Sequence, residues 1–203
     1  MSTENTQQGL QVTQQNEQAL QSAAANDEIR LKLQNFTQKL NAQPKPESLG
    51  ETPDKKGKTI LISHIETTLD EYYFGLWETV NFRWEQIGNE VVGAIDLRVF
   101  HPVAGVWITR QGAASIVIMV DRAPEGVSQQ ERNLWALDMQ NKKSNALDMG
   151  FPKLKAECLK NAANNLGTLF GRDINRKEKD RDVFTPLFRI KPQPTTDATG
   201  TAG

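Results

Sequence analysis

The stretch "EVVGAIDLRVFHPVAGVWITRQGAASIVIMV", residues 90–120, decides the fold that the sequence predicts. Apolar residues occupy every second position, first at Ile95, Leu97 and Val99 and then at Ala114, Ile116, Ile118 and Val120. Alternation with period two, carried by β-branched residues, is typical of strands with one buried face. The segment "HPVAG" (His101–Gly105) separates the two runs and has the proline and glycine of a turn. Residues 90–120 therefore predict two successive strands of one antiparallel sheet.

A third strand and a helix are predicted before this stretch. In "WETVNFRWEQI" the apolar residues Val80, Phe82 and Trp84 alternate, which predicts another half-buried strand. The preceding segment "TILISHIETTLDEYYFGLW" has an apolar entry and then a helix around Ile65–Tyr73, which we expect to stop at Gly75.

Two helical segments are predicted after the sheet. The first lies near Gln129–Gln140. For the second, Pro152 suits the first turn of a helix that runs from Lys153 to about Leu169. The chain is thus predicted to be an α+β protein with a β-β-β-α core, in which a curved antiparallel sheet packs on a long helix.

The composition divides the chain into four regions. Residues 1–25 are rich in Gln, Asn, Ser and Thr and predict a disordered tail. Residues 26–58 predict a short amphipathic helix, with Ile29, Leu33, Phe36 and Leu40 on one stripe, followed by a linker rich in Pro, Gly and charge. Residues 59–191 form the predicted folded domain, and residues 192–203 a second disordered tail.

Charge is distributed unevenly along the chain. The formal net charge is −1, but residues 142–191 hold twelve Lys and Arg against six Asp and Glu. A basic segment within a neutral protein is typical of binding to a polyanion, although an ordinary solvated helix face is as consistent with it. The sequence has one cysteine, no secretory signal and no apolar run of membrane-spanning length, so we expect a cytoplasmic protein.

The residues give little support for bond chemistry. "GKT" at Gly57–Thr59 lacks the first glycine of a phosphate-binding loop, because residue 52 is Thr52. The two histidines and the single cysteine do not have the spacing of a zinc site, so no cofactor is expected. A magnesium-dependent nuclease stays as an alternative, since six carboxylates lie close in the sequence: Asp70, Glu71, Glu78, Glu85, Glu90 and Asp96.

The segment "CLKNAANNLGTLFGRDINRK", residues 158–177, is the strongest candidate for binding. Small residues and amides flank Lys160 and Asn164, so a nucleic-acid backbone could approach closely and the amides, including Asn161 and Asn165, could donate to phosphate oxygens. Further basic residues extend this surface: Arg172, Arg176 and Lys177 downstream, and Lys142, Lys143, Lys153 and Lys155 upstream. Such contacts would be independent of sequence and sensitive to salt. The alternative is that the glycines only end the helix and the asparagines only pack.

Three segments together resemble the single-strand annealing proteins of the Rad-fifty-two superfamily, above all their short phage versions, the Sak-type recombinases. They are "HIETTLDEYYFGLW", "RVFHPVAGVWITRQGAAS" and "KSNALDMGFPKLKAECLKNAANNLGTLFGRDINRK". The resemblance spans roughly His64 to Lys177, and its most specific part is "A-x-x-x-L-K-x-A-x-x-x-L/F-G-x-x-L/F-G" in the final helix.

The resemblance implies a fold and a set of DNA contacts. It implies a β-β-β-α core, a ring of subunits and single-stranded DNA in an outer positive groove. By position in the motif it implies that Lys160 faces the DNA, together with Lys143 or Lys142, while Lys56 and Lys58 are looser matches. Eukaryotic relatives carry arginines where this chain has Asn161 and Asn164, so Arg172 and Arg176 are expected to compensate.

The resemblance also implies a function and partners. We expect ATP-independent binding of single-stranded DNA and annealing of complementary strands in homologous recombination and repair, by a phage- or prophage-encoded protein that makes and breaks no bonds. The expected partners are single-stranded DNA, further copies of the chain in a ring or filament, and a host single-strand-binding protein. A non-enzymatic assembly module remains a second alternative to annealing, beside the nuclease.

Overall fold

The computed structural model describes residues 22, 24–52 and 55–176 of the chain. After a helix over residues 24–40, the elements are η1 (Pro46–Ser48), β1 (Leu49–Glu51), β2 (Lys58–Ile60), α2 (Ile62–Tyr73), β3 (Trp77–Ile87), β4 (Glu90–His101), β5 (Val106–Val117), α3 (Gln129–Leu137), η2 (Met139–Asn141), α4 (Ala146–Asn164) and η3 (Thr168–Phe170). The α+β class is confirmed.

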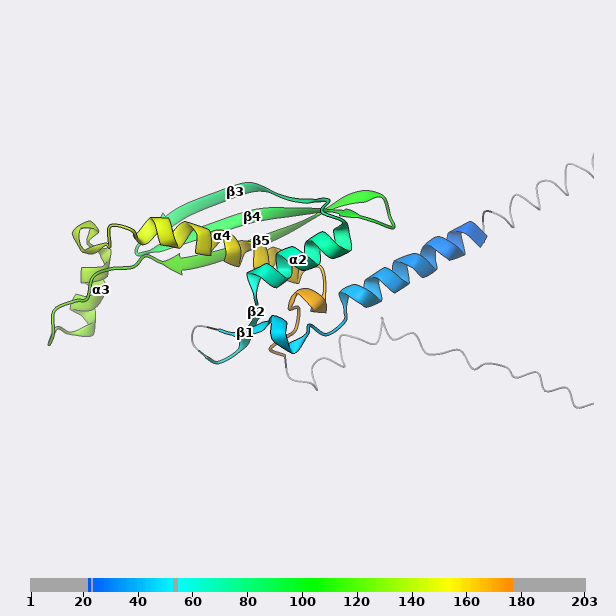
Figure 1. The fold of residues 1–203 in the computed structure, drawn as a ribbon. Coiled ribbons are helices and arrows are strands. Elements are labelled where there is room, and N and C mark those ends of the chain that lie inside the picture. Colours follow the sequence, from blue (N-terminus) through cyan, green and yellow to red (C-terminus); the bar gives the residue numbers. More distant parts are fainter. Residues whose placement is uncertain (1–21, 23, 53–54, 177–203) are drawn as a thin grey trace, which may run out of the picture.

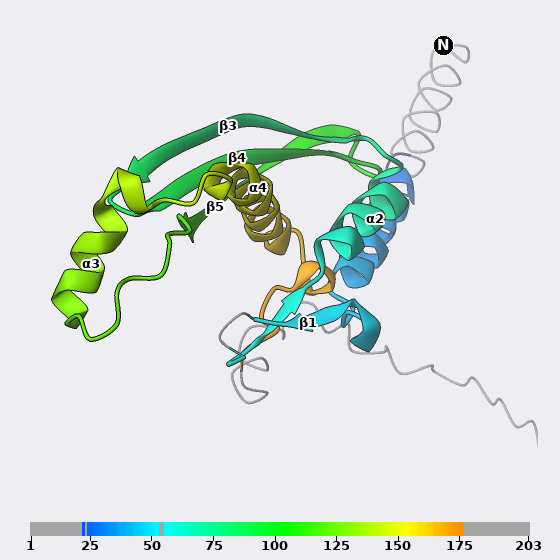
Figure 2. The ribbon, with the colours of Figure 1, turned by 60° about the vertical axis from the view of Figure 1, so that its left-hand side comes forward.

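The main sheet is antiparallel, with β4 between β3 and β5 (Figure 1). On β4 the side chains of Val91, Ile95, Leu97 and Val99 are buried, as the alternation predicted. The predicted turn lies at residues 102–105, between the end of β4 and Val106 at the start of β5. Helix α4 lies along one face of this sheet, while α2 and the N-terminal helix lie near one end of it (Figure 2).

The predicted phase of β3 is wrong. Val80 pairs with Asp96 and Trp84 pairs with Gly93, two positions three residues apart on β4. Directly paired residues share a face and successive residues alternate, so Val80 and Trp84 point to opposite faces. The cause is an irregularity between Val80 and Arg83, where Asn81 has a left-handed φ of 55°. Because β3 is an edge strand, Trp84 also stays 57% exposed.

The predicted start and end of the long helix are also wrong. Helix α4 begins at Ala146, so Pro152 lies inside it rather than in its first turn. Proline cannot donate to the carbonyl four residues earlier, which usually costs helix stability. The segment stays helical because Ala146, Gly150 and Leu154 form a buried stripe. At the other end the α-helix stops at Asn164, and the predicted continuation to Leu169 is a separate 3-10 turn, η3.

The N-terminal helix packs on the core through its last turns. Phe36 is 9% exposed and Leu40 7% exposed, whereas Ile29 is 49% exposed, so only the second half of the predicted apolar stripe is buried. The Phe36 ring makes edge contacts with Tyr73, at 5.8 Å between centroids, and with His101, at 4.8 Å. Residues 1–21, 23, 53–54 and 177–203 lie outside the described residues. They include most of the predicted N-terminal tail, all of the predicted C-terminal tail, and Lys177.

The predicted linker contains regular structure. Strand β1 pairs antiparallel with β2, with Leu49 opposite Ile60 and Glu51 opposite Lys58. Ser48 is buried, and its hydroxyl donates to the Lys45 carbonyl at 2.6 Å. The β1–β2 ladder therefore runs across residue 59, where the sequence placed the start of the folded domain.

Candidate nucleic-acid interface

Helix α4 is held against the sheet at very short range. A Cβ atom built on Gly112 of β5 would overlap the α4 backbone at Cys158 and Ala162, and one on Gly93 of β4 would lie 2.9 Å from Leu154. Cys158, Ala162 and Ala163 are fully buried. The small residues of this helix therefore serve close helix–sheet packing. Burial also raises the pKa of the Cys158 thiol, which lies in the core.

Two of the predicted phosphate donors are used within the fold. The Asn161 amide donates to the Ala113 carbonyl at 2.6 Å, and the Asn165 amide donates to the Gln111 carbonyl at 3.3 Å. Both acceptors belong to β5, so carbonyls of that strand are satisfied by side-chain amides from α4 and from its C-cap residue. The interpretation of Asn161 and Asn165 as free donors to phosphate is wrong in this conformation.

Lys160 is less available than its place in the motif implies. Its ammonium lies 2.9 Å from a carboxylate oxygen of Glu157, one helical turn earlier, and its side chain is only 16% exposed. The Glu157 side chain is 38% exposed. A DNA phosphate would have to compete with Glu157 for this ammonium.

The two glycines of "LGTLFG" support internal packing. A Cβ on Gly167 would overlap the Leu40 carbonyl of the N-terminal helix. Gly171 has a φ of 101°, and a Cβ there would lie 2.8 Å from Ile60. Both glycines thus allow other segments of this chain to approach, so they do more than end the helix, which was the alternative interpretation of the sequence.

The basic residues after α4 also have intramolecular partners. Arg172 donates to the carbonyl of Asn164 at 3.1 Å and to that of Asn165, and so completes the C-terminal end of the helix. Arg176 lies 2.9 Å from an oxygen of Asp173. The Arg176 side chain is still 48% exposed, so it remains accessible to a ligand.

Lys58 joins this group through Asn175. The Lys58 backbone N–H donates to the Asn175 side chain at 2.8 Å, and the Asn175 amide donates back to the Lys58 carbonyl at 2.9 Å. The β1–β2 hairpin is thereby tied to Asn175, and the side chains of Lys56 and Lys58 in this hairpin are exposed. Lys58 therefore lies next to the segment that carries Arg172 and Arg176.

The other predicted lysines lie in the first half of α4 and just before it. Lys142 forms an isolated bridge with Val120, and the Lys143 N–H donates to the Met119 carbonyl at 3.1 Å. Lys143 and Lys153 have exposed side chains, and Lys142 is half-buried. The 19 residues of α4 span about 28 Å. The predicted basic residues are thus spread along α4 and beyond both of its ends rather than gathered at one point.

The carboxylates of the nuclease alternative do not converge. Asp70 accepts from the Trp77 indole at 2.7 Å, and Glu78 pairs with Arg98 at 2.6 Å. Hydrogen bonds from Asn81 and Gln111 hold the pKa of Asp96 below its usual range. No group of three or more His, Cys, Asp or Glu that could hold a metal occurs within the described residues.

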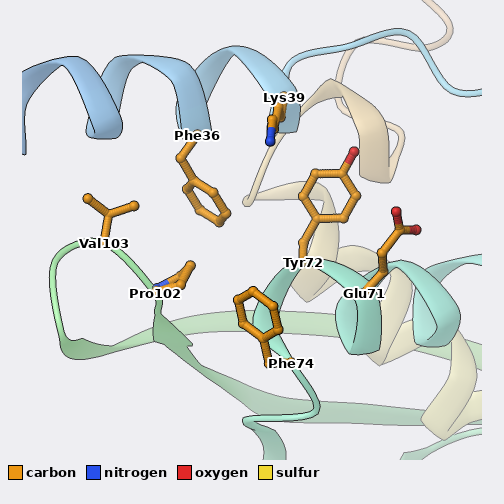
Figure 3. A pocket seen from close by; sticks show the side chains of 7 residues that line it. All are labelled: Phe36, Lys39, Glu71, Tyr72, Phe74, Pro102 and Val103. Atoms are coloured by element: carbon orange, nitrogen blue, oxygen red, sulfur yellow. The ribbon is translucent and has the colours of Figure 1, made fainter.

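An apolar pocket of about 390 Å³ lies apart from the basic residues, between the N-terminal helix, α2 and the turn after β4 (Figure 3). Its lining residues are Phe36, Lys39, Glu71, Tyr72, Phe74, Pro102 and Val103. Phe74 is 73% exposed and has a left-handed φ of 56°. Sequence reasoning did not find this pocket, because its walls come from three segments far apart in the chain.

Sequence reasoning also missed a polar pocket at the α3 end of the molecule. It has a volume of about 390 Å³ and is lined by residues 120–125 together with Arg132 and Trp135. The signal that could have found it is the arginine and tryptophan one turn apart in "ERNLWAL".

No family model matches the chain, and no curated protein matches it significantly. Across the part of the chain that the structure describes, none of the helices has both the length and the apolarity to cross a membrane. The choice of function therefore depends on the residues and their geometry.

Proposed function

We propose that this chain binds single-stranded DNA and anneals complementary strands without ATP. The main observation behind the proposal is a helix with exposed lysines packed on a three-stranded sheet, in the β-β-β-α order that annealing proteins share. Lys143, Lys153 and Lys155 are exposed, whereas Lys142 and Lys160 are partly buried. The exposed lysines would contact backbone phosphates, which hold the strand in place without reading its sequence.

Annealing of this kind needs positioning and charge screening. Two complementary strands repel each other through their phosphates, and lysines that neutralise one backbone lower that repulsion. If the strand is held along a helix about 28 Å long, several bases can face a second strand at once. No covalent step is needed, and the carboxylates described above are left as hydrogen-bonding and solvated residues.

Assembly into a ring or filament belongs to the same proposal. Strand β3 is the edge of the sheet, and none of the other described strands pairs with its outer side. It exposes Phe82, Trp84 and Ile87 at 37, 57 and 61%. An unpaired edge with apolar side chains is favourable for pairing with a second copy. A host single-strand-binding protein remains a candidate partner by resemblance alone.

The first test is annealing of two complementary labelled oligonucleotides without ATP, at low and high salt, with the particle mass measured in parallel. Fast, salt-sensitive pairing by a large oligomer is expected. The double variant Lys143→Ala/Lys153→Ala should lower the dependence of log affinity on log salt by about 1.4, from two lost phosphate contacts. The matched control Arg30→Ala/Lys32→Ala removes the same charge from the N-terminal helix and should leave that slope unchanged.

The other outcomes separate the alternatives. A large particle without affinity for DNA would leave only the assembly module. Cleavage of the oligonucleotides with magnesium and not with a chelator would replace annealing by nuclease activity. Loss of binding in the control double variant alone would move the interface to the N-terminal helix.

A further inference from the structure

The pocket at the α3 end of the molecule, called here the Trp135 pocket, combines an aromatic ring with two arginines and two acidic residues. Its volume is about 390 Å³, and its residues are Val120, Asp121, Arg122, Ala123, Pro124, Glu125, Arg132 and Trp135. One wall is the loop after β5 and the other is α3, which lies at the far end of the sheet from α2 (Figure 2).

One hydrogen bond holds the Trp135 ring, and two others hold the backbone around it. Its indole N–H donates to the Asp121 carbonyl at 3.1 Å, while the Asn141 amide donates to the Trp135 carbonyl at 3.1 Å. The Asp121 N–H in turn donates to the Asn141 carbonyl at 2.7 Å. Since the indole N–H already has a hydrogen-bond acceptor, a ligand would contact the ring through its faces.

The pocket also has an available cation. Arg132 is exposed and forms no ion pair with another residue that the structure describes. Arg122 pairs with Glu125 at 3.3 Å, but both side chains are 87% exposed, so water weakens this pair. Arg132 can therefore donate hydrogen bonds to a phosphate without first breaking an ion pair.

The pocket adjoins the lysines of the proposed DNA interface. Val120, in the pocket wall, bridges to Lys142, and the N–H of the next residue, Lys143, donates to the Met119 carbonyl. The Trp135 pocket and Lys143 are therefore neighbours in the structure, and one DNA strand could contact both.

We propose that the Trp135 pocket holds one base of the bound single strand against the indole, with Arg132 on an adjoining phosphate. This inference rests on the proposed DNA binding and adds a base-stacking site to it. Stacking on an indole is open to every base, so the site would be tolerant of sequence. It would fix one point of the strand while the lysines along α4 screen the rest.

The test uses the full chain and a short oligo-dT strand, with tryptophan fluorescence and affinity as readouts. Oligo-dT is expected to quench the wild-type fluorescence, and Trp135→Phe should remove most of this quenching. Trp135→Ala should weaken binding about tenfold, and Arg132→Ala should lower the salt slope by about 0.7. Trp107→Phe is the matched control, because Trp107 is 45% exposed on β5 and should leave quenching and affinity unchanged.

The outcomes distinguish this inference from the function beneath it. If the wild type binds and anneals, and Trp135→Phe and Arg132→Ala keep full quenching, affinity and salt slope, the pocket is no base site but the function stands. If the wild type does not bind oligo-dT, both proposals fail. If the Trp135 and Arg132 variants change the particle mass but not DNA affinity, the pocket is a protein contact and the inference is overturned. Arg132 is exposed, so Arg132→Ala is expected to leave the fold of α3 unchanged. It therefore tests the pocket even if Trp135→Ala fails to fold.

Discussion

Gly112 of β5 lies directly against the backbone of Ala162 in α4, with no room for a side chain between them. The contact is close because both residues are small and Ala162 is fully buried. It fixes the height of α4 above the sheet, and with it the position of every side chain on the outer face of the helix. The proposed interface therefore depends on a glycine that would never touch DNA.

Gly112→Ala should destabilise the protein by roughly 3 kcal/mol, at the upper end of overpacking costs, because the obstacle is backbone that cannot rotate away. Urea unfolding followed by circular dichroism measures this. Ala113→Ser, at the neighbouring exposed position on β5, is the control and should change stability by less than about 0.5 kcal/mol. Equal stability of the two variants would mean that α4 is not packed as closely as described.

The docking of the N-terminal helix gives a second prediction. Phe36→Ala removes the ring that contacts both Tyr73 and His101, and should cost about 3 kcal/mol, the lower end for such truncations, because Phe36 lies at the margin of the core. Hydrogen exchange should then show faster exchange over residues 24–40. Ile29→Ala is the control, since Ile29 is half exposed. Unchanged exchange in Phe36→Ala would mean that Leu40 alone holds the helix.

The sequence predicted the central strand best. Strand β4 is paired along both edges and buries one face under α4, so alternation at Ile95, Leu97 and Val99 matches burial. On β3 the same rule failed, because an edge strand tolerates exposed apolar residues and the irregularity at Asn81 reverses the phase. Pro152 misled the placement of α4 because local propensity favours proline in a first turn, whereas buried contacts on both sides of it keep the longer helix.

The candidate interface was predicted less well than the fold. Periodicity separates the buried and outer faces of α4, and Lys153 is indeed exposed. Periodicity cannot show whether a polar side chain on the outer face points into solvent or contacts the edge of a strand. Asn161 does the latter, because its amide donates to a β5 carbonyl. Nor can periodicity show that Lys160 is paired, because Glu157 three residues earlier is an ordinary helical spacing.

The ion pair on α4 leads to a third prediction. Glu157→Gln would release the Lys160 ammonium and remove a negative charge beside the proposed DNA path. Affinity for oligo-dT should rise about threefold, since a partly exposed pair is worth less than about 1 kcal/mol. Lys160→Ala alone should reduce affinity less than Lys143→Ala, because Lys160 is already neutralised locally. Fluorescence anisotropy at two salt concentrations measures all three variants, and a drop in affinity on Glu157→Gln would contradict the assignment.

The stability of the β4–β5 turn is expected to depend on pH through His101. The N–H groups of Val103 and Ala104 donate to its Nδ1 at 3.3 and 3.1 Å, which requires that this nitrogen carry no proton. Burial lowers the pKa of His101 below its ordinary value of 6.5, and Phe36 lies against the ring. The unfolded chain therefore binds a proton more readily than the folded one. Stability from this group is complete above pH 6.5 and is lost as pH falls through the lowered folded-state pKa.

The free energy of unfolding, measured by urea titration from pH 8 to pH 5, should thus stay level to about pH 7 and then decline. His101→Asn is the informative variant, because its amide oxygen can still accept from the turn but does not titrate. It should lower stability at pH 8 and flatten the decline below pH 6.5. A decline of the same steepness in His101→Asn would assign the pH dependence to other groups, and the neutral imidazole would then only shape the turn.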